Sequence, residues 1–184
     1  MLVFLTLYIF TLRQIAKLMG GDMKALSTSF LMLPTIFLTT NTLYDIFMLV
    51  LVFFSSLHHS KNGRYKILAN LDSTFIVGVV SSILLSYWSS ISITLFTFLE
   101  SQILQSNTIK YMLLGLCNLY IMWNHSEHSI FVYFNSLSFF LWKKFKPRLF
   151  FRIQWHLSCA LLLSALIPII QKDILLQPIH HRLR

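Results

Sequence analysis

Long apolar runs with few charges between them recur along this chain and limit what it can fold into. Several of them approach about 20 residues, the length of α-helix that spans the hydrocarbon core of a bilayer. Charged residues make up 11% of the 184 residues and hydrophobic residues 56%, whereas a soluble domain carries about 25% charged residues. The sequence therefore predicts an all-α, polytopic transmembrane helix bundle, an integral multi-pass membrane protein rather than a soluble domain.

Hydropathy divides the chain into three parts. Residues 1–20 form an N-terminal hydrophobic segment, expected to be a signal anchor or an interfacial helix because its apolar run is short for a span. Residues 23–171 hold the predicted transmembrane bundle, and residues 172–184 form a polar, basic tail. Polar residues inside the bundle are costly and therefore need a reason to be there.

Apolar runs within the bundle give the predicted spans. They cover residues 23–41, 43–59, 72–105, 108–123, 129–142 and 153–171. As one helix, the run 72–105 would be about 51 Å long at 1.5 Å per residue, much longer than the hydrocarbon core. We therefore expect a break in its serine-rich stretch at 86–92, which gives about seven spanning helices after the N-terminal segment.

The positive charge of the chain is informative about orientation. A net charge of +9 would suggest nucleic acid as the partner of a soluble chain, but in a membrane bundle the cations sit in short loops. With the predicted break, the loops 13–24, 60–71, 100–110 and 143–152 share one side and hold twelve lysines and arginines, against three in the tail. This side is predicted to face the cytosol, and no nucleic-acid partner is expected.

Cysteines and short motifs point to no other class of protein. Cys117 and Cys159 both lie inside apolar runs, where free buried thiols are expected rather than a disulfide. The chain has neither a Cys/His cluster of the zinc-finger type nor a glycine-rich phosphate-binding loop.

A group of polar residues is predicted at one end of the bundle. The segment 53–60, F-F-S-S-L-H-H-S, places Ser55 and His59 four residues apart, on one face of a helix. Asp72 is expected to open the next span, and His156 the last one. The topology derived from charge puts all four side chains on the same side of the membrane, where we expect them to converge.

These residue types suit metal-assisted hydrolysis. Neutral imidazoles bind Zn²⁺, so His59 and His156 are the candidate metal ligands, and the metal would lower the pKa of a bound water toward about 7. Asp72 is the candidate base or orienting group, and Ser55 the candidate donor to a developing oxyanion. An ordinary interfacial role suits the same residues, because histidine and aspartate are common beside basic loops and Asp72 fits a helix N-cap. Spacing alone leaves both interpretations open.

The same residues resemble a known superfamily. The chain resembles the CREST superfamily of seven-helix membrane hydrolases in three features. A serine lies four residues before a histidine at the end of one span, an aspartate opens the next span, and a histidine opens the last. Within it, the chain looks most like the myomaker-like and post-GPI-attachment phospholipase-like proteins. The likeness extends over residues 23–171 in patches and is carried by M-L-P-T-I at 32–36, V-F-F-S-S-L-H-H-S-K-N-G at 52–63 and W-H-L-S-C-A-L-L-L-S at 155–164.

The resemblance implies an enzyme that hydrolyses an amide or ester bond of a membrane lipid. It also implies a zinc ion held by one histidine of the second helix and two histidines of the last. Ser55, His59, Asp72 and His156 match this pattern. The residue four positions before His156 is Arg152, where the resemblance implies a further histidine ligand.

Arg152 leaves three interpretations open. The first is a zinc-dependent lipid hydrolase with a degenerate site. Either His59 and His156 hold the metal together with Asp72, or His58, His125 or His128 replaces the missing ligand, although the predicted topology puts His125 and His128 at the opposite face. The second is a metal-free relative, a non-catalytic membrane-remodelling or cell-fusion protein in which Arg152 could pair with Asp72. The third is a small accessory subunit. The expected partners are membrane lipids, with a homo-oligomer or a larger membrane complex as the assembly.

Overall fold

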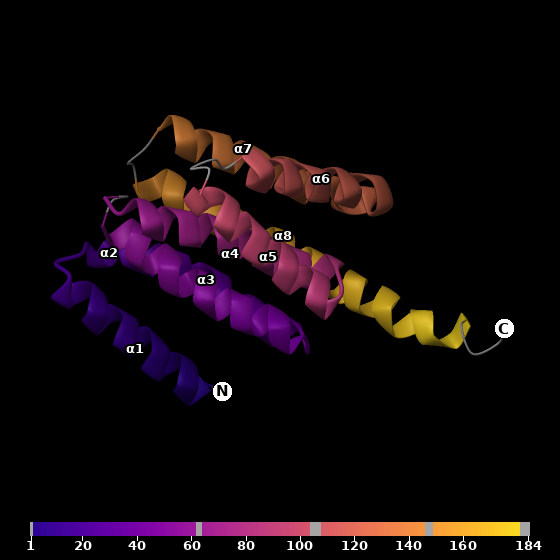
Figure 1. Ribbon diagram of the computed structural model, residues 1–184, viewed down its shortest axis with the longest axis horizontal. Helices are drawn as coiled ribbons and strands as arrows, with labels where there is room; N and C mark the ends of the chain where they lie inside the picture. The colour runs from indigo at the N-terminus through magenta and orange to yellow at the C-terminus, as the bar shows by residue number, and fades with distance from the viewer. Residues whose placement is uncertain (1, 62–63, 104–107, 146–148, 181–184) are drawn as a thin grey trace.

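The computed structural model describes residues 2–61, 64–103, 108–145 and 149–180, with the backbone alone for 169–180. All regular secondary structure within these ranges is helical, which confirms the predicted all-α class. The helices run alongside one another in both directions and form an elongated bundle (Figure 1).

Short connections join successive helices. The helices are α1 (Leu2–Leu18), α2 (Met23–Ser27), the 3-10 helix η1 (Thr28–Leu38), α3 (Thr42–Ser60), α4 (Lys66–Leu84), α5 (Tyr87–Ile103), α6 (Thr108–Asn124), the 3-10 helix η2 (Ser126–His128), α7 (Ser129–Lys144) and α8 (Leu149–His180). The strongest packing joins α3 to α4, α4 to α5, α7 to α8 and α8 to η1. The helix α4 therefore lies between α3 and α5, and α8 lies between η1 and α7.

One end of the bundle gathers basic residues. The helices α1, α3 and α7 end there, and α2, α4 and α8 begin there (Figure 1). We call it the basic end, defined by Lys17, Lys24, Lys61, Lys66 and Lys144. Four basic loops were predicted to share one side of the membrane. Their described residues do lie toward one end of the molecule.

The predicted break after the fourth helix is present. Leu85 is extended, with φ −127° and ψ 167°, and α4 ends before it. The next helix begins at Tyr87, and the hydroxyl of Ser90 donates a hydrogen bond to the carbonyl of Ser81 across the turn, at 2.9 Å. The chain thus folds back at the start of the serine-rich stretch, and the Ser81 carbonyl accepts there from the Leu85 amide as well as from the Ser90 hydroxyl.

The predicted number of spans is not confirmed. Within the described residues, three helical segments are long and apolar enough to cross a membrane: Thr42–Ser60, Lys66–Leu84 and Leu149–Pro168. The predicted first span, 23–41, is instead divided between the short α2 and η1, which contains Pro34. Proline has no amide hydrogen to donate to an α-helix. The helices α1, α5 and α6 have 17 residues each, or about 25 Å at 1.5 Å per residue, less than the roughly 30 Å of the hydrocarbon core.

Two predicted helix starts were wrong. The helix α4 begins at Lys66 and α8 at Leu149, so Asp72 and His156 lie about two turns inside their helices instead of opening them. Basic residues had been assigned to loops, but the stretches K-I-L-A-N-L and L-F-F-R-I-Q contain good helix formers. The capping interpretation of Asp72 is also wrong, because Tyr65 occupies the N-cap position of α4.

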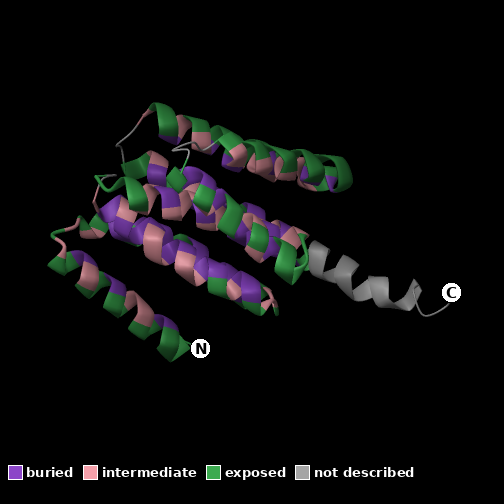
Figure 2. Cartoon of the chain, viewed as in Figure 1, coloured by how far each residue is buried: buried purple, intermediate pink, exposed green. Residues whose placement is uncertain are grey.

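The best-buried part of the bundle surrounds α3. Its Tyr44, Met48 and Val52 are fully buried and belong to one apolar cluster with residues of η1, α4 and α8. The hydroxyl of Tyr44 donates to that of Thr35 at 2.7 Å, so the one polar group of this ring is satisfied. In Figure 2 the buried residues concentrate along α3 and its neighbours.

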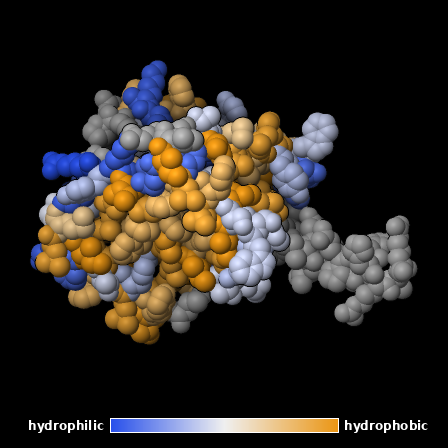
Figure 3. All heavy atoms as spheres, in the orientation of Figure 1, coloured by the Kyte–Doolittle hydropathy of each residue, from blue (hydrophilic) through white to orange (hydrophobic). Residues whose placement is uncertain are grey.

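The outer helices expose large apolar side chains. Trp88, Leu95, Trp123, Tyr133 and Phe140 are all more than half exposed. Figure 3 shows hydrophobic side chains across the middle of one face, with the strongly hydrophilic ones mostly toward the basic end. An apolar surface of this kind marks a site of membrane or protein contact in a helical protein.

Candidate functional site

A cavity of about 790 Å³ lies among α3, α4, α6, α7 and α8. Toward the basic end its lining is polar and includes Ser55, His59, Asp72, Lys110, Arg152 and His156. Farther along the same helices the lining is apolar and includes Ile76, Val80, Ile83, Leu114, Leu162 and Leu166. The cavity is therefore amphipathic along its length, with one polar end.

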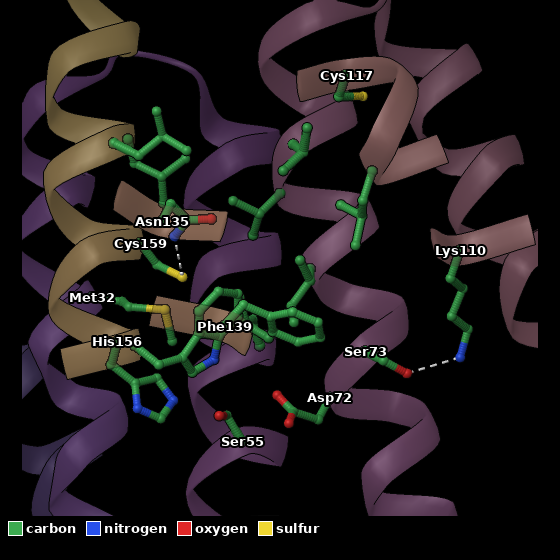
Figure 4. A pocket seen from close by; sticks show the side chains of 18 of the residues that line it. Met32, Ser55, Asp72, Ser73, Lys110, Cys117, Asn135, Phe139, His156 and Cys159 are labelled. Atoms are coloured by element: carbon green, nitrogen blue, oxygen red, sulfur yellow. Dashed lines mark hydrogen bonds between the residues drawn. The ribbon is translucent and has the colours of Figure 1, made fainter. Parts of the chain in front are cut away.

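The four residues singled out from the sequence all line this cavity. Ser55 and His59 come from α3, Asp72 from α4 and His156 from α8. Figure 4 shows Ser55 and Asp72 pointing into the same space, with His156 on the facing helix. The convergence expected from helix spacing and charge is thus present, while the chemical roles of these residues stay predictions.

Two imidazoles face each other at the polar end. The ring centroids of His59 and His156 are 4.9 Å apart, and the planes are inclined by 81°. Both side chains are buried, and Nδ1 of His156 lies 3.0 Å from the backbone carbonyl oxygen of Arg152. When Nδ1 carries the proton and donates to this carbonyl, Nε2 remains as the acceptor of the His156 ring.

Ser55 has a buried partner that the sequence did not indicate. The hydroxyl of Ser29, in η1, donates to the hydroxyl of Ser55 at 3.0 Å, and both residues are almost completely buried. Because a hydroxyl that accepts one hydrogen bond still carries its own proton, Ser55 retains a donor. Ser29 lies outside every predicted motif, so only the packing of η1 against α3 reveals its role.

Lys110 is a cavity residue that the sequence analysis did not select. Its Nζ donates to the backbone carbonyl of Asn70 at 3.2 Å and to the hydroxyl of Ser73 at 2.9 Å, as Figure 4 shows for Ser73. The side chain is 1% exposed. A lysine near the start of an apolar helix was the available signal, because intramembrane charges usually have a specific partner.

Asn135 joins the two helices that close the other side of the cavity. Its side-chain amide, on α7, donates to the hydroxyl of Ser158 and to the sulfur of Cys159, both at 3.2 Å and both on α8; Figure 4 shows the contact with Cys159. Cys159 and Cys117 are free, as expected from the sequence, and both line the cavity. The amide contact holds α7 against α8 near the cavity wall.

Arg152 also lines the polar end of the cavity. The side chain is 6% exposed, and its Nε has no hydrogen-bond partner among the described residues. Asp22, the N-cap of α2, interacts with it electrostatically. However, Asp22 is exposed and accepts hydrogen bonds from the amides of Lys24 and Ala25. Part of this guanidinium is thus buried without a matched acceptor.

The described residues do not fit the three-ligand zinc site that the resemblance implies. They contain no group of three or more histidine, cysteine, aspartate or glutamate side chains placed to hold a metal ion. His59 and His156 would supply two nitrogens, but Arg152 stands where the third is expected. A guanidinium is always protonated and has no lone pair to offer, so it opposes a cation instead of ligating one.

His125 and His128 lie outside the cavity. Both are near the carboxylate of Glu127, with Nδ1–Oε1 distances of 3.9 Å and 3.7 Å. His125 is the N-cap of η2 and His128 its last residue, between α6 and α7, at the end of the bundle opposite the basic end (Figure 1). Neither lines the cavity with His59, so neither replaces the missing ligand there.

Comparison with models of known protein families, with curated proteins and with solved structures returned no match. The similarity to the CREST superfamily therefore stays a prediction that depends on the quoted motifs.

Proposed function

We propose that this chain is an integral, multi-pass membrane protein that binds one membrane lipid in its cavity. The polar head of the lipid would lie among Ser55, His59 and His156, and its acyl part would follow the apolar wall toward Leu166. The observation that carries the proposal is a cavity whose charged and imidazole side chains lie at one end, with a mainly apolar lining along the rest.

The shape and chemistry of the cavity suit an amphiphile. From Asp72 to Ile83 along α4, and from His156 to Leu166 along α8, the lining changes from polar to apolar over about 15 Å of helix. Each methylene group that leaves water for such a wall contributes about 0.8 kcal/mol. The volume of about 790 Å³ also lies within the usual range of small-molecule sites, roughly 300–1,000 Å³.

The membrane placement follows from the helices that form the cavity. Three segments, in α3, α4 and α8, are long and apolar enough to span, and all three contribute to the cavity wall. We expect the shorter helices to cross or to line the bilayer beside them, because their outer faces expose large apolar side chains. The basic end would face the cytosol by the positive-inside rule.

A phenylalanine at Gly115 tests lipid binding directly. Gly115 lines the cavity on α6, and an added Cβ would meet nothing within 4 Å, so we expect a phenylalanine there to be tolerated and to take up cavity space. We expect Gly115→Phe to weaken binding of a fluorescent single-chain lipid by about tenfold, equivalent to about 1.4 kcal/mol. The neighbouring Leu116→Phe is the matched control, because Leu116 is 54% exposed and does not line the cavity.

Two results would contradict the proposal. One is a wild-type protein, purified in mild detergent, that neither retains a lipid in non-denaturing mass spectrometry nor binds the fluorescent lipid. The other is equal binding by Gly115→Phe, Leu116→Phe and the wild type, which would place the lipid outside the cavity.

Hydrolysis of the bound lipid is a second candidate function. It is favoured by the close approach of His59 and His156 with Ser55 and Asp72 lining the same cavity, in line with the resemblance to lipid hydrolases. Metal analysis of the purified wild type beside Arg152→His separates the two functions. About one zinc per wild-type chain would support the hydrolase, whereas zinc in the Arg152→His variant alone would support a metal-free lipid-binding protein.

A further inference from the structure

We infer that the polar end of the cavity recognises an anionic headgroup, a phosphate or a carboxylate, and that Arg152 is the side chain that binds it. The inference rests on the proposed lipid binding and adds the chemical class of the ligand. Arg152 stands where the resemblance implies a histidine ligand, and in this inference that arginine determines which ligand the cavity binds.

The first support is the environment of Arg152. Arg152 is only 6% exposed and lines the cavity. Its Nε has no hydrogen-bond partner among the described residues. A buried guanidinium is costly unless it is paired. An anion in the cavity would supply the missing acceptor.

The second support is the balance of charge around the cavity. Its described lining contains three cationic side chains, Arg152, Lys110 and Lys143, and one carboxylate, Asp72. Lys110 already donates to Asn70 and Ser73 and interacts electrostatically with Glu100 and Asp72. The remaining positive charge is on Lys143, which is exposed, and on Arg152, which the exposed Asp22 compensates only from outside the cavity lining.

The third support is the position of Arg152 along the cavity. Arg152 precedes His156 by four residues, one helical turn, and so lies beside it on one face of α8. This face continues into the apolar wall at Leu162 and Leu166. A lipid whose acyl part follows that wall would therefore bring its headgroup to the guanidinium.

The geometry of arginine favours oxyanions over neutral headgroups. The guanidinium presents its N–H groups in a planar fork that matches two oxygens of a carboxylate or a phosphate. Lysine has the same charge without the fork. The class of ligand is thus an acidic lipid, either a phosphate-bearing lipid or a free fatty acid.

The experiment measures the binding of matched lipids to the wild type, Arg152→Gln and Arg152→Lys in detergent. The probes are phosphatidic acid, oleic acid and the neutral diacylglycerol. We expect the wild type to prefer one or both acidic lipids over diacylglycerol by about tenfold or more. Arg152→Gln should remove this preference and leave diacylglycerol binding within about twofold, and Arg152→Lys should fall between them.

Arg13→Gln is the matched control, since Arg13 is an exposed cation near the basic end that does not line the cavity. It should leave all three affinities unchanged. The relative affinity of the two acidic lipids identifies the headgroup as phosphate or carboxylate. If Arg152→Gln does not fold, the preference of the wild type for acidic over neutral lipid, and its reduction in Arg152→Lys, still test the inference.

The outcomes separate this inference from the proposed function. Equal binding of acidic and neutral lipids by the wild type, or an unchanged preference in Arg152→Gln, would overturn the anionic headgroup and leave lipid binding standing. No binding of any probe would overturn the proposed function and the inference with it.

Discussion

The two walls of the cavity are built very differently. The wall formed by α3 has eleven buried residues in one 19-residue helix, including Tyr44, Met48 and Val52. The wall formed by α6 has two, Lys110 and Ile121, and α7 has three. The wall of α3 is thus part of the apolar core, whereas the outer wall, formed by α6 and α7, has few buried residues.

This difference indicates which side of the cavity opens. Local opening is cheapest where few buried apolar contacts must be broken. The helix α6 satisfies this condition, since it is joined to α4 through Lys110. The helix α7 is packed more firmly, because its Asn135 and the ring of its Phe139 both contact α8. We therefore expect lipid to enter between α6 and α4.

Truncation in the core should have the largest effect. Met48 is fully buried in α3, so Met48→Ala should lower the free energy of unfolding by about 2–5 kcal/mol through lost contacts and a new cavity. Met122, on α6, is 45% exposed. Met122→Ala should therefore change the free energy of unfolding by less than about 0.5 kcal/mol. Thermal unfolding in detergent measures both, and similar losses would remove the contrast between the walls.

Removal of the Lys110 charge should loosen the outer wall. Lys110→Met removes the hydrogen bonds to Asn70 and Ser73 and the electrostatic interaction with Glu100 and Asp72, which should cost about 3 kcal/mol. Lys143→Met removes an exposed cation that contacts Tyr111 at 3.4 Å and should cost about 1 kcal/mol or less.

The readout is hydrogen exchange along α6 together with the unfolding midpoint. Faster exchange confined to α6 and α7 in Lys110→Met would support the outer wall as the one that opens. Faster exchange throughout α3 instead would contradict it.

Alanine substitutions at two glycines should change the stability of the protein in opposite directions. A Cβ at Gly78 would lie 3.1 Å from Oγ1 of Thr94 and 3.2 Å from the ring of Phe47, so Gly78→Ala should destabilise the protein by about 1–3 kcal/mol. A Cβ at Gly115 would meet nothing within 4 Å. Gly115→Ala should therefore stabilise α6 by up to about 1 kcal/mol. We expect the unfolding midpoint to fall in Gly78→Ala and to rise in Gly115→Ala. A fall in both variants would show that α6 is packed as tightly as α4.

Much of the site could be predicted because it depends on spacing within helices. Ser55 and His59 share a helix face whatever their neighbours do, and the distribution of lysine and arginine gave the correct shared end for the helix termini. The break between α4 and α5 followed from the length of the apolar run. These are local properties of the sequence.

Other features could not be predicted because they depend on tertiary packing or on local helix propensity. The starts of α4 and α8 were misplaced because charge was used to mark loops, although lysine and arginine are good helix formers. Ser29 and Lys110 enter the site only through the packing of η1 on α3 and of α6 on α4. The departure at Arg152 was visible in the sequence, but its burial was not.

The single polar end of the cavity has a consequence for sidedness in the bilayer. Because the charged and imidazole side chains of the lining lie toward the basic end, an amphiphile is expected to enter in one orientation, with its headgroup at the depth of one leaflet. Inner leaflets of cell membranes carry the anionic lipids, and the positive-inside rule directs the basic end to that same leaflet. The protein would then bind lipids from one leaflet only, and its occupancy would depend on the composition of that leaflet and not of the other.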